Sequence, residues 1–280
     1  MPNATTALYE PLIERDLDAI PSAARAFVAA QSVYDLWVAV TRFAVLAYAP
    51  SMHARHALLA CRAAYELREA IGERWVELLI ECARYTAESR APWSEPPLVD
   101  PPAVESVGSL ADTLRSGERL AAEQWLAAHL HDESLEDELR NAASDEAILL
   151  IDAAFALAPL LGEKGRYALL RTVVWELVAA ARGGSFAMTR NASLDALIAD
   201  AVAARGAVDA VQAVLVHIAR ERLPIIAAAP SLDPYPLARD YAQTLLAHAA
   251  ARRLPSPDAL LAAVHDNLQH GESYADLSFA

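Results

Sequence analysis

Two histidines three residues apart, His53 and His56, are the first residues of this chain whose type and spacing could do chemistry. Residues three apart on a helix share a face, so the pair could bind one metal ion or act on one substrate. Histidine titrates near neutral pH, and we take both as candidate catalytic acid/base groups. A solvent-exposed structural role remains open. We predict no metal site, because the paired Glu-x-x-His motifs of di-iron bundles are absent.

Charged residues also interrupt several strongly apolar segments of the sequence. They are Arg42, Asp152, Glu176, Glu221 and Arg222. A buried charge needs a partner, so one interpretation is a set of ion pairs between structural units. The other is a polar pocket where the units converge, since helical bundles often bind small ligands between their helices. The pocket would be lined by Arg42, His53, His56, His217 and Glu221, with Arg42, His217 and Glu221 as candidate substrate-binding residues.

The elements that would position these residues recur along the chain. The run Ala63-Ala64-Tyr65-Glu66-Leu67, followed by Gly72-Glu73, returns 90 positions later as Ala153-Ala154-Phe155-Ala156-Leu157, followed by Gly162-Glu163. Each copy predicts a helix, a glycine turn and a second helix. We predict three tandem helical units over residues 1–90, 104–183 and 193–270, with a proline-rich connector over 91–103.

The composition predicts an all-α fold. Hydrophobic residues make up 55% of the 280 residues, only nine are glycine, and alanine, the best helix former, is abundant. We expect one all-helical domain over residues 1–280, packed as a compact bundle or a short curved array. In the first unit we expect a lead-in helix over 8–19, ended by Pro21, and one long buried helix over 23–48.

The net charge of −14 and the lack of a Lys/Arg cluster argue against nucleic acid and anionic membrane surfaces as partners. We expect no signal peptide and no membrane span, because the most apolar windows are short or contain charges. A cytoplasmic location follows, with Cys61 and Cys82 as buried, reduced thiols or, alternatively, a redox pair. No nucleotide-binding loop or catalytic signature motif occurs, so the sequence assigns no cofactor.

The stretch from His53 to Tyr85 resembles the questin oxidase-like family of helical oxygenases. The residues that carry the resemblance are His53-Ala54-Arg55-His56-Ala57-Leu58-Leu59, Ala63-Ala64-Tyr65-Glu66-Leu67, Arg74, Glu77-Leu78-Leu79 and Ala83-Arg84-Tyr85. The resemblance implies helices around an aromatic polyketide and a Baeyer–Villiger-type oxygenation. Among the family's site residues it implies only His53 or His56. Where it implies a second histidine one or two turns later, this chain has Ala60 or Ala63.

The leading hypothesis is therefore a helical protein that binds a small molecule where its units meet. It would be an oxygenase-like or acid/base enzyme acting on an aromatic or polyketide-type substrate, with Arg42 holding an anionic or enolate oxygen. The alternative is a non-catalytic helical repeat scaffold that binds a protein partner. Self-association into a homo-oligomer is a third possibility.

Overall fold

The computed structural model describes residues 3–46, 48, 52–66, 68–89, 100–104 and 107–183, and eleven positions between 193 and 222. Every regular element in this described part is a helix, which confirms the all-α prediction. None of these helices is both long enough and apolar enough to cross a membrane. Most of the connector over 91–103 and of the predicted third unit over 193–270 lies outside the described residues.

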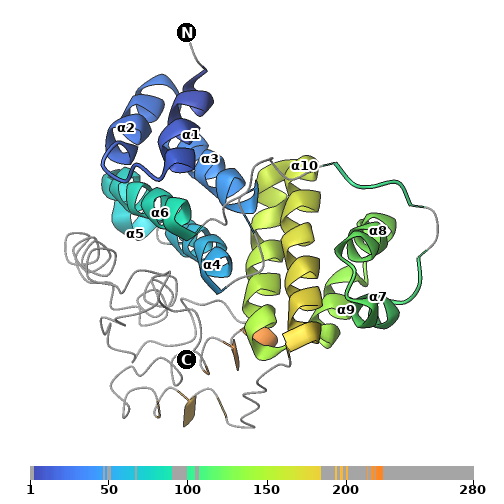
Figure 1. Ribbon diagram of the computed structural model, residues 1–280. Helices are drawn as coiled ribbons and strands as arrows, with labels where there is room; N and C mark the ends of the chain where they lie inside the picture. Colours follow the sequence, from blue (N-terminus) through green and yellow to red (C-terminus); the bar gives the residue numbers. More distant parts are fainter. Residues whose placement is uncertain are drawn as a thin grey trace.

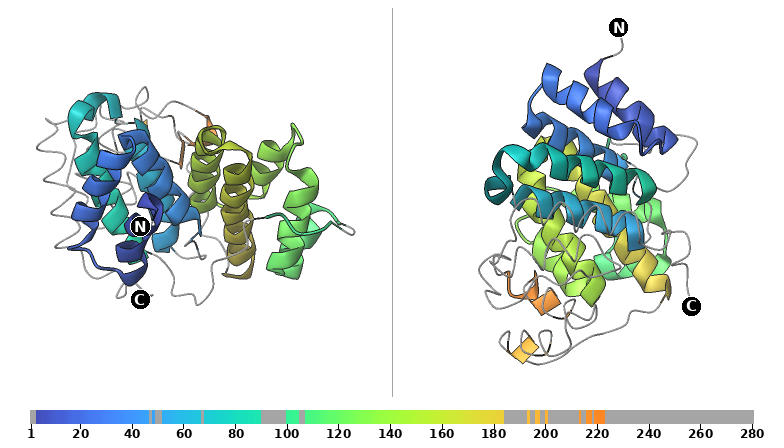
Figure 2. Two further views of the ribbon diagram at one scale, coloured as in Figure 1. Left: turned by 90° about the horizontal axis from the view of Figure 1, so that it is seen from above. Right: turned by 90° about the vertical axis from the view of Figure 1, so that its left-hand side faces the viewer.

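The helices form two groups with one long element between them. The first group is α1 (Ala4–Glu14), α2 (Ile20–Ala30), α3 (Val33–Leu46), α4 (Met52–Glu66), α5 (Arg68–Ile71), the 3-10 helix η1 (Gly72–Arg74) and α6 (Trp75–Ser89). The second group is α7 (Leu110–Ser116), α8 (Arg119–His129) and α9 (Leu135–Ala142). The long element is α10 (Asp145–Gly183), which lies between the two groups and contacts both (Figures 1 and 2).

The α10 element is a helical hairpin, because the chain reverses at Gly162. Gly162 has φ 71° and ψ 178°, a backbone conformation that essentially only glycine adopts. The two halves, over 145–161 and 163–183, run side by side (Figure 1). Gly72 also has a positive φ, 61°, and lies between α4 and α6, which pack closely on each other. Both predicted glycine turns are therefore present.

One cluster of buried hydrophobic side chains runs through both groups of helices. Two tryptophans anchor it, each on the helix that packs against one of the hairpins. Trp37 of α3 is fully buried and donates its indole N–H to the carbonyl oxygen of Cys61, at 2.9 Å. Trp125 of α8 is 1% exposed and packs beside α10. Cys61 and Cys82 are buried thiols, as predicted.

The long helix predicted over 23–48 is wrong, because the chain breaks between α2 and α3. Gln31 is extended, with φ −133° and ψ −150°. The Asp35 carboxylate accepts hydrogen bonds from the backbone N–H and hydroxyl of Ser32, at 3.1 and 2.6 Å, and the Ser32 hydroxyl oxygen accepts from the Asp35 N–H. These reciprocal bonds are those of a capping box, which starts a new helix at Val33.

The lead-in helix is also displaced from its predicted range of 8–19. The Asn3 side chain accepts a hydrogen bond from the Thr5 N–H at 2.9 Å, which caps α1 at its start. The helix ends at Glu14, because Arg15 has a left-handed backbone with φ 58°. Pro21 lies in the first turn of α2, where its missing N–H costs nothing, and so begins that helix.

Candidate ligand-binding site

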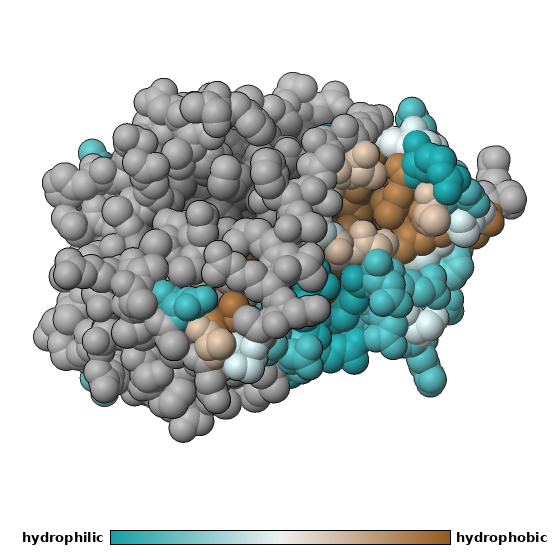
Figure 3. Space-filling view, turned by 90° about the horizontal axis from the view of Figure 1, so that it is seen from below, coloured by the Kyte–Doolittle hydropathy of each residue, from teal (hydrophilic) through white to brown (hydrophobic). Residues whose placement is uncertain are grey.

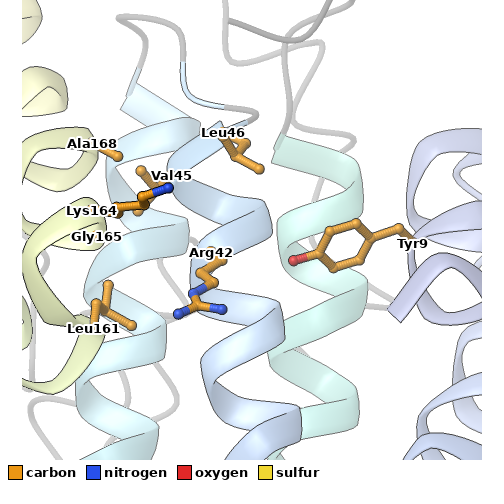
Figure 4. A pocket seen from close by; sticks show the side chains of 8 residues that line it. All are labelled: Tyr9, Arg42, Val45, Leu46, Leu161, Lys164, Gly165 and Ala168. Atoms are coloured by element: carbon orange, nitrogen blue, oxygen red, sulfur yellow. The ribbon is translucent and has the colours of Figure 1, made fainter. Parts of the chain in front are cut away.

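A pocket lies between α3 and the second half of α10, with α1 closing one side. Its volume is about 250 Å³. It is lined by Tyr9, Arg42, Val45, Leu46, Leu161, Lys164, Gly165 and Ala168. Figure 4 shows Arg42 projecting from α3, Lys164 extending from α10 toward Val45, and Tyr9 reaching in from α1. The pocket thus draws its walls from segments more than 100 residues apart.

Apolar side chains form most of the pocket wall. Val45 and Leu161 belong to the core and are 3% and 4% exposed, and Ala168 is equally buried. Gly165 leaves room for the Leu161 side chain in this wall, because a Cβ atom there would lie 2.4 Å from the Cβ of Leu161. A ligand in this pocket therefore needs an apolar body to match these walls.

Two cations face this otherwise apolar space. Arg42 and Lys164 are both exposed, and neither forms an ion pair with any residue that the structure describes. Their charges are of the same sign and come from the two walls that α3 and α10 provide. An anionic group can accept charge-assisted hydrogen bonds from side chains of this kind.

Tyr9 supplies the polar group of the third wall. Its hydroxyl donates to the carbonyl oxygen of Ala39 at 3.0 Å, and its ring meets Phe43 edge-on with centroids 5.2 Å apart. Burial raises the pKa of Tyr9 to about 12, against the opposing effect of the Arg42 charge. The phenol therefore stays protonated at neutral pH, and its oxygen keeps a lone pair that can accept a hydrogen bond.

The expectation that Arg42 is a buried charge is wrong. The α3 residues that pack inward include Thr41 and Phe43, both buried, whereas Asp35, Val38 and Arg42 follow a less buried stripe at helical spacing. Arg42 lies on that outer stripe, at the edge of the pocket. It needs no buried partner, and its guanidinium remains available to a ligand.

Most of the other charges in apolar helices are partnered, as the ion-pair interpretation predicted. Asp152 of α10 is ion-paired with Arg62 of α4 and with Arg140 of α9, the latter at 3.0 Å. Glu176 accepts a hydrogen bond from the Tyr48 hydroxyl at 2.6 Å. Arg222 is ion-paired with Asp137. The contacts of Asp152 and Glu176 tie the first group of helices to α10, and Asp152 also ties α9 to it.

The other candidate residues are not described as lining the pocket. His53 and His56 lie in the first turn of α4, and their side chains fall outside the described part of the structure. His217 is partly buried and Glu221 is exposed, and the Glu221 N–H donates to the His217 carbonyl oxygen at 3.0 Å. Of the predicted site residues, the pocket's described lining contains Arg42 alone.

Sequence reasoning missed Tyr9 and Lys164. No local pattern indicates Tyr9, because it lies in α1 and the whole of α2 separates it from Arg42 in α3. Lys164 had a usable signal, because it stands in a short insertion relative to the first unit, directly after the Gly162 turn.

Within the described residues, no three His, Cys, Asp or Glu side chains gather in a way that would hold a metal ion. The chain matches no known protein-family model, and searches of curated proteins and of solved structures likewise return no match.

Proposed function

We propose that this protein binds a small anionic molecule with an apolar body in the pocket between α3 and α10. The observation that carries the proposal is the pair of cations Arg42 and Lys164, which face apolar walls and form no ion pair with a described residue. In a chain with a net charge of −14, two such cations at one pocket favour an anionic ligand.

The size of the pocket limits the ligand. Its volume of about 250 Å³ lies just below the range of roughly 300–1,000 Å³ typical of sites for drug-sized molecules. An aromatic carboxylate or phenolate of one or two rings fits this limit. In the proposed complex Arg42 and Lys164 hold the anionic oxygen, and Leu161 and Val45 pack against the ring.

Acid/base chemistry on such a ligand remains a prediction that rests on His53 and His56. Both are in the first turn of α4, next to α3 in the fold, and α4 also packs on α10. Substitution of each histidine by alanine tests the role directly. If the fold is intact and turnover of a bound substrate is unchanged in both variants, neither histidine is catalytic.

The binding proposal is tested with 1-naphthoate and its uncharged amide, measured by calorimetry on the full chain. We expect the naphthoate to bind and the amide to bind much more weakly. Arg42→Gln and Lys164→Gln should each reduce naphthoate affinity by about tenfold, because a hydrogen bond to a charged group contributes roughly 1.5–3 kcal/mol.

The matched control is Arg115→Gln, which removes a cation from an exposed position on α7. This substitution changes the net charge by the same amount as Arg42→Gln or Lys164→Gln but should leave naphthoate binding unchanged. Equal affinity for acid and amide, or equal losses in all three variants, would refute the assignment of the pocket.

We also propose that the hairpin of α4 and α6 and the hairpin of α10 are copies of one unit, with residues 193–270 as a third. Support comes from Gly72 and Gly162, 90 positions apart, which both turn the chain with positive φ. Trp37 and Trp125 support it too, because each is buried on the helix that packs against its own hairpin. An experimental structure that resolves residues 193–270 without two paired helices would contradict the third copy.

The second candidate function is a scaffold for a protein partner, or for a second copy of this chain. Figure 3 shows apolar surface gathered between hydrophilic borders on the side of the molecule where α7–α9 lie. Leu120 of α8 is 60% exposed and Val104 is 46% exposed. Absence of anion binding together with a concentration-dependent mass in size-exclusion chromatography would favour this candidate. A cytoplasmic location belongs to both proposals and accords with two thiols kept unbridged.

A further inference from the structure

A second group of interest lies where the second half of α10 packs on α8, around Arg171. This arginine is 2% exposed, and its Nε–H is buried without an acceptor. Its guanidinium forms no hydrogen bond or ion pair with any residue that the structure describes. Arginine keeps its charge in proteins, so the side chain brings into the interior a positive charge that has no hydrogen-bonded counter-ion among the described residues.

The Glu123 carboxylate attracts Arg171 through space but forms no ion pair with it. Glu123 of α8 accepts a hydrogen bond from the Trp175 indole N–H at 2.8 Å and another from the Tyr167 hydroxyl at 3.2 Å. Burial lowers the pKa of Arg171, and the charges of Glu123 and Tyr167 oppose that shift only in part. The negative charge of Glu123 therefore offsets the positive charge of Arg171 only in part.

A second cation, Arg119, lies over the same aromatic ring as Arg171. The guanidinium carbons of Arg171 and Arg119 lie 4.9 and 5.1 Å from the centre of the Trp175 ring. A ring face attracts cations only weakly compared with a full charge. Arg119 is exposed to solvent, so of the two guanidinium groups only that of Arg171 brings its charge into the interior.

We propose that Arg171 binds a small monovalent anion between α8 and the second half of α10. The anion is the size of chloride or formate and accepts hydrogen bonds from the N–H groups of the guanidinium. The site is separate from the pocket at Arg42. Tyr167 and Trp175, four residues before and after Arg171, both hydrogen-bond to Glu123 of α8, whereas no residue of α8 is among those that line the pocket at Arg42.

The test is urea denaturation of the full chain at constant ionic strength, with unfolding monitored by circular dichroism. Chloride or formate replaces the strongly hydrated fluoride ion step by step. The denaturation midpoint of the wild type should rise and then saturate as the anion binds the folded state. Arg171→Met should abolish this rise, and in fluoride its midpoint should be no lower than that of the wild type, because an apolar side chain replaces a buried charge.

Two further variants sharpen the result. Arg115→Met removes an exposed cation and should keep the full anion dependence. Glu123→Gln removes the competing negative charge and should lower the apparent dissociation constant on the order of tenfold. A response to chloride but not formate, or the reverse, identifies the anion.

A wild-type midpoint that is the same in fluoride, chloride and formate overturns the proposal, as does a response that Arg171→Met retains. If Arg171→Met does not fold, a crystal of the wild type soaked in bromide decides the question. An anomalous peak in contact with the Arg171 guanidinium supports the site, and its absence there refutes it.

Discussion

Arg62 of α4 and Asp152 of α10 stand 90 positions apart in the sequence and form an ion pair with each other. Each occupies the same place in its hairpin, ten residues before the glycine that turns the chain. Arg62 also binds Glu66 at 2.9 Å, and Asp152 also binds Arg140. The two residues thus carry opposite charges and hold the two hairpins together through a partly buried network.

Asp152→Asn should destabilise the protein by about 3 kcal/mol, because it leaves the guanidinium groups of Arg62 and Arg140 together without their shared carboxylate. Urea denaturation measures the loss. A double-mutant cycle with Arg62→Met should show coupling of at least about 1 kcal/mol. The control is Asp112→Asn, at an exposed ion pair with Arg115, whose effect should be much smaller. Equal losses in the two aspartate variants would contradict a structural role for the network.

Gly162→Ala should cost about 2 kcal/mol, because ψ of 178° at positive φ is open to glycine alone. Gly72→Ala should cost about 1 kcal/mol, the usual penalty for a side chain at positive φ. A Cβ atom meets no neighbour within 4 Å at either position, so the penalty comes from the backbone. The free energy of unfolding of both variants gives the comparison. A loss at Gly72 larger than that at Gly162 would show that the second turn is less constrained than its dihedral angles indicate.

Trp37→Phe should destabilise the protein by about 2 kcal/mol, since it removes a buried hydrogen bond as well as part of the ring. Trp125→Phe should cost about 1 kcal/mol, because its ring is equally buried but its indole N–H donates to no residue that the structure describes. Thermal denaturation of the two variants compares them directly. Equal losses would mean that packing alone, without the bond to Cys61, sets the contribution of Trp37.

Tyr9→Phe should flatten the loss of stability at alkaline pH. The pKa of Tyr9 is about 12 in the folded protein against an ordinary value of 10.0, so the unfolded chain loses this proton first. Its contribution is complete below pH 10 and disappears as the pH rises to about 12, which amounts to about 2 kcal/mol. At pH 7 the variant should lose about 1 kcal/mol, the value of the hydrogen bond to Ala39. Parallel stability curves for the two proteins between pH 10 and 12 would contradict the shifted pKa.

The helical hairpins could be predicted from the sequence because a local signal, glycine between apolar helices, recurs at Gly72 and Gly162. The break before α3 was missed because the apolar pattern runs through it, although Ser32 and Asp35 have the spacing of a capping box. Whether Arg42 faces inward depends on which side of α3 packs against other helices. Apolar residues occur around nearly the whole circumference of this helix, so its periodicity did not show which side is exposed. The pocket itself depends on the meeting of Tyr9, Arg42 and Lys164, and no spacing in the sequence encodes that long-range contact.

The pocket also has a consequence for synthesis of the chain. Its walls come from Tyr9 at one extreme and Ala168 at the other, so a nascent polypeptide that has not yet released α10 from the ribosome carries only one side of the cleft. A ligand held there cannot assist the early steps of folding. The ligand stabilises only the folded state in which α10 has packed against α3, and binding therefore shows that this packing is complete.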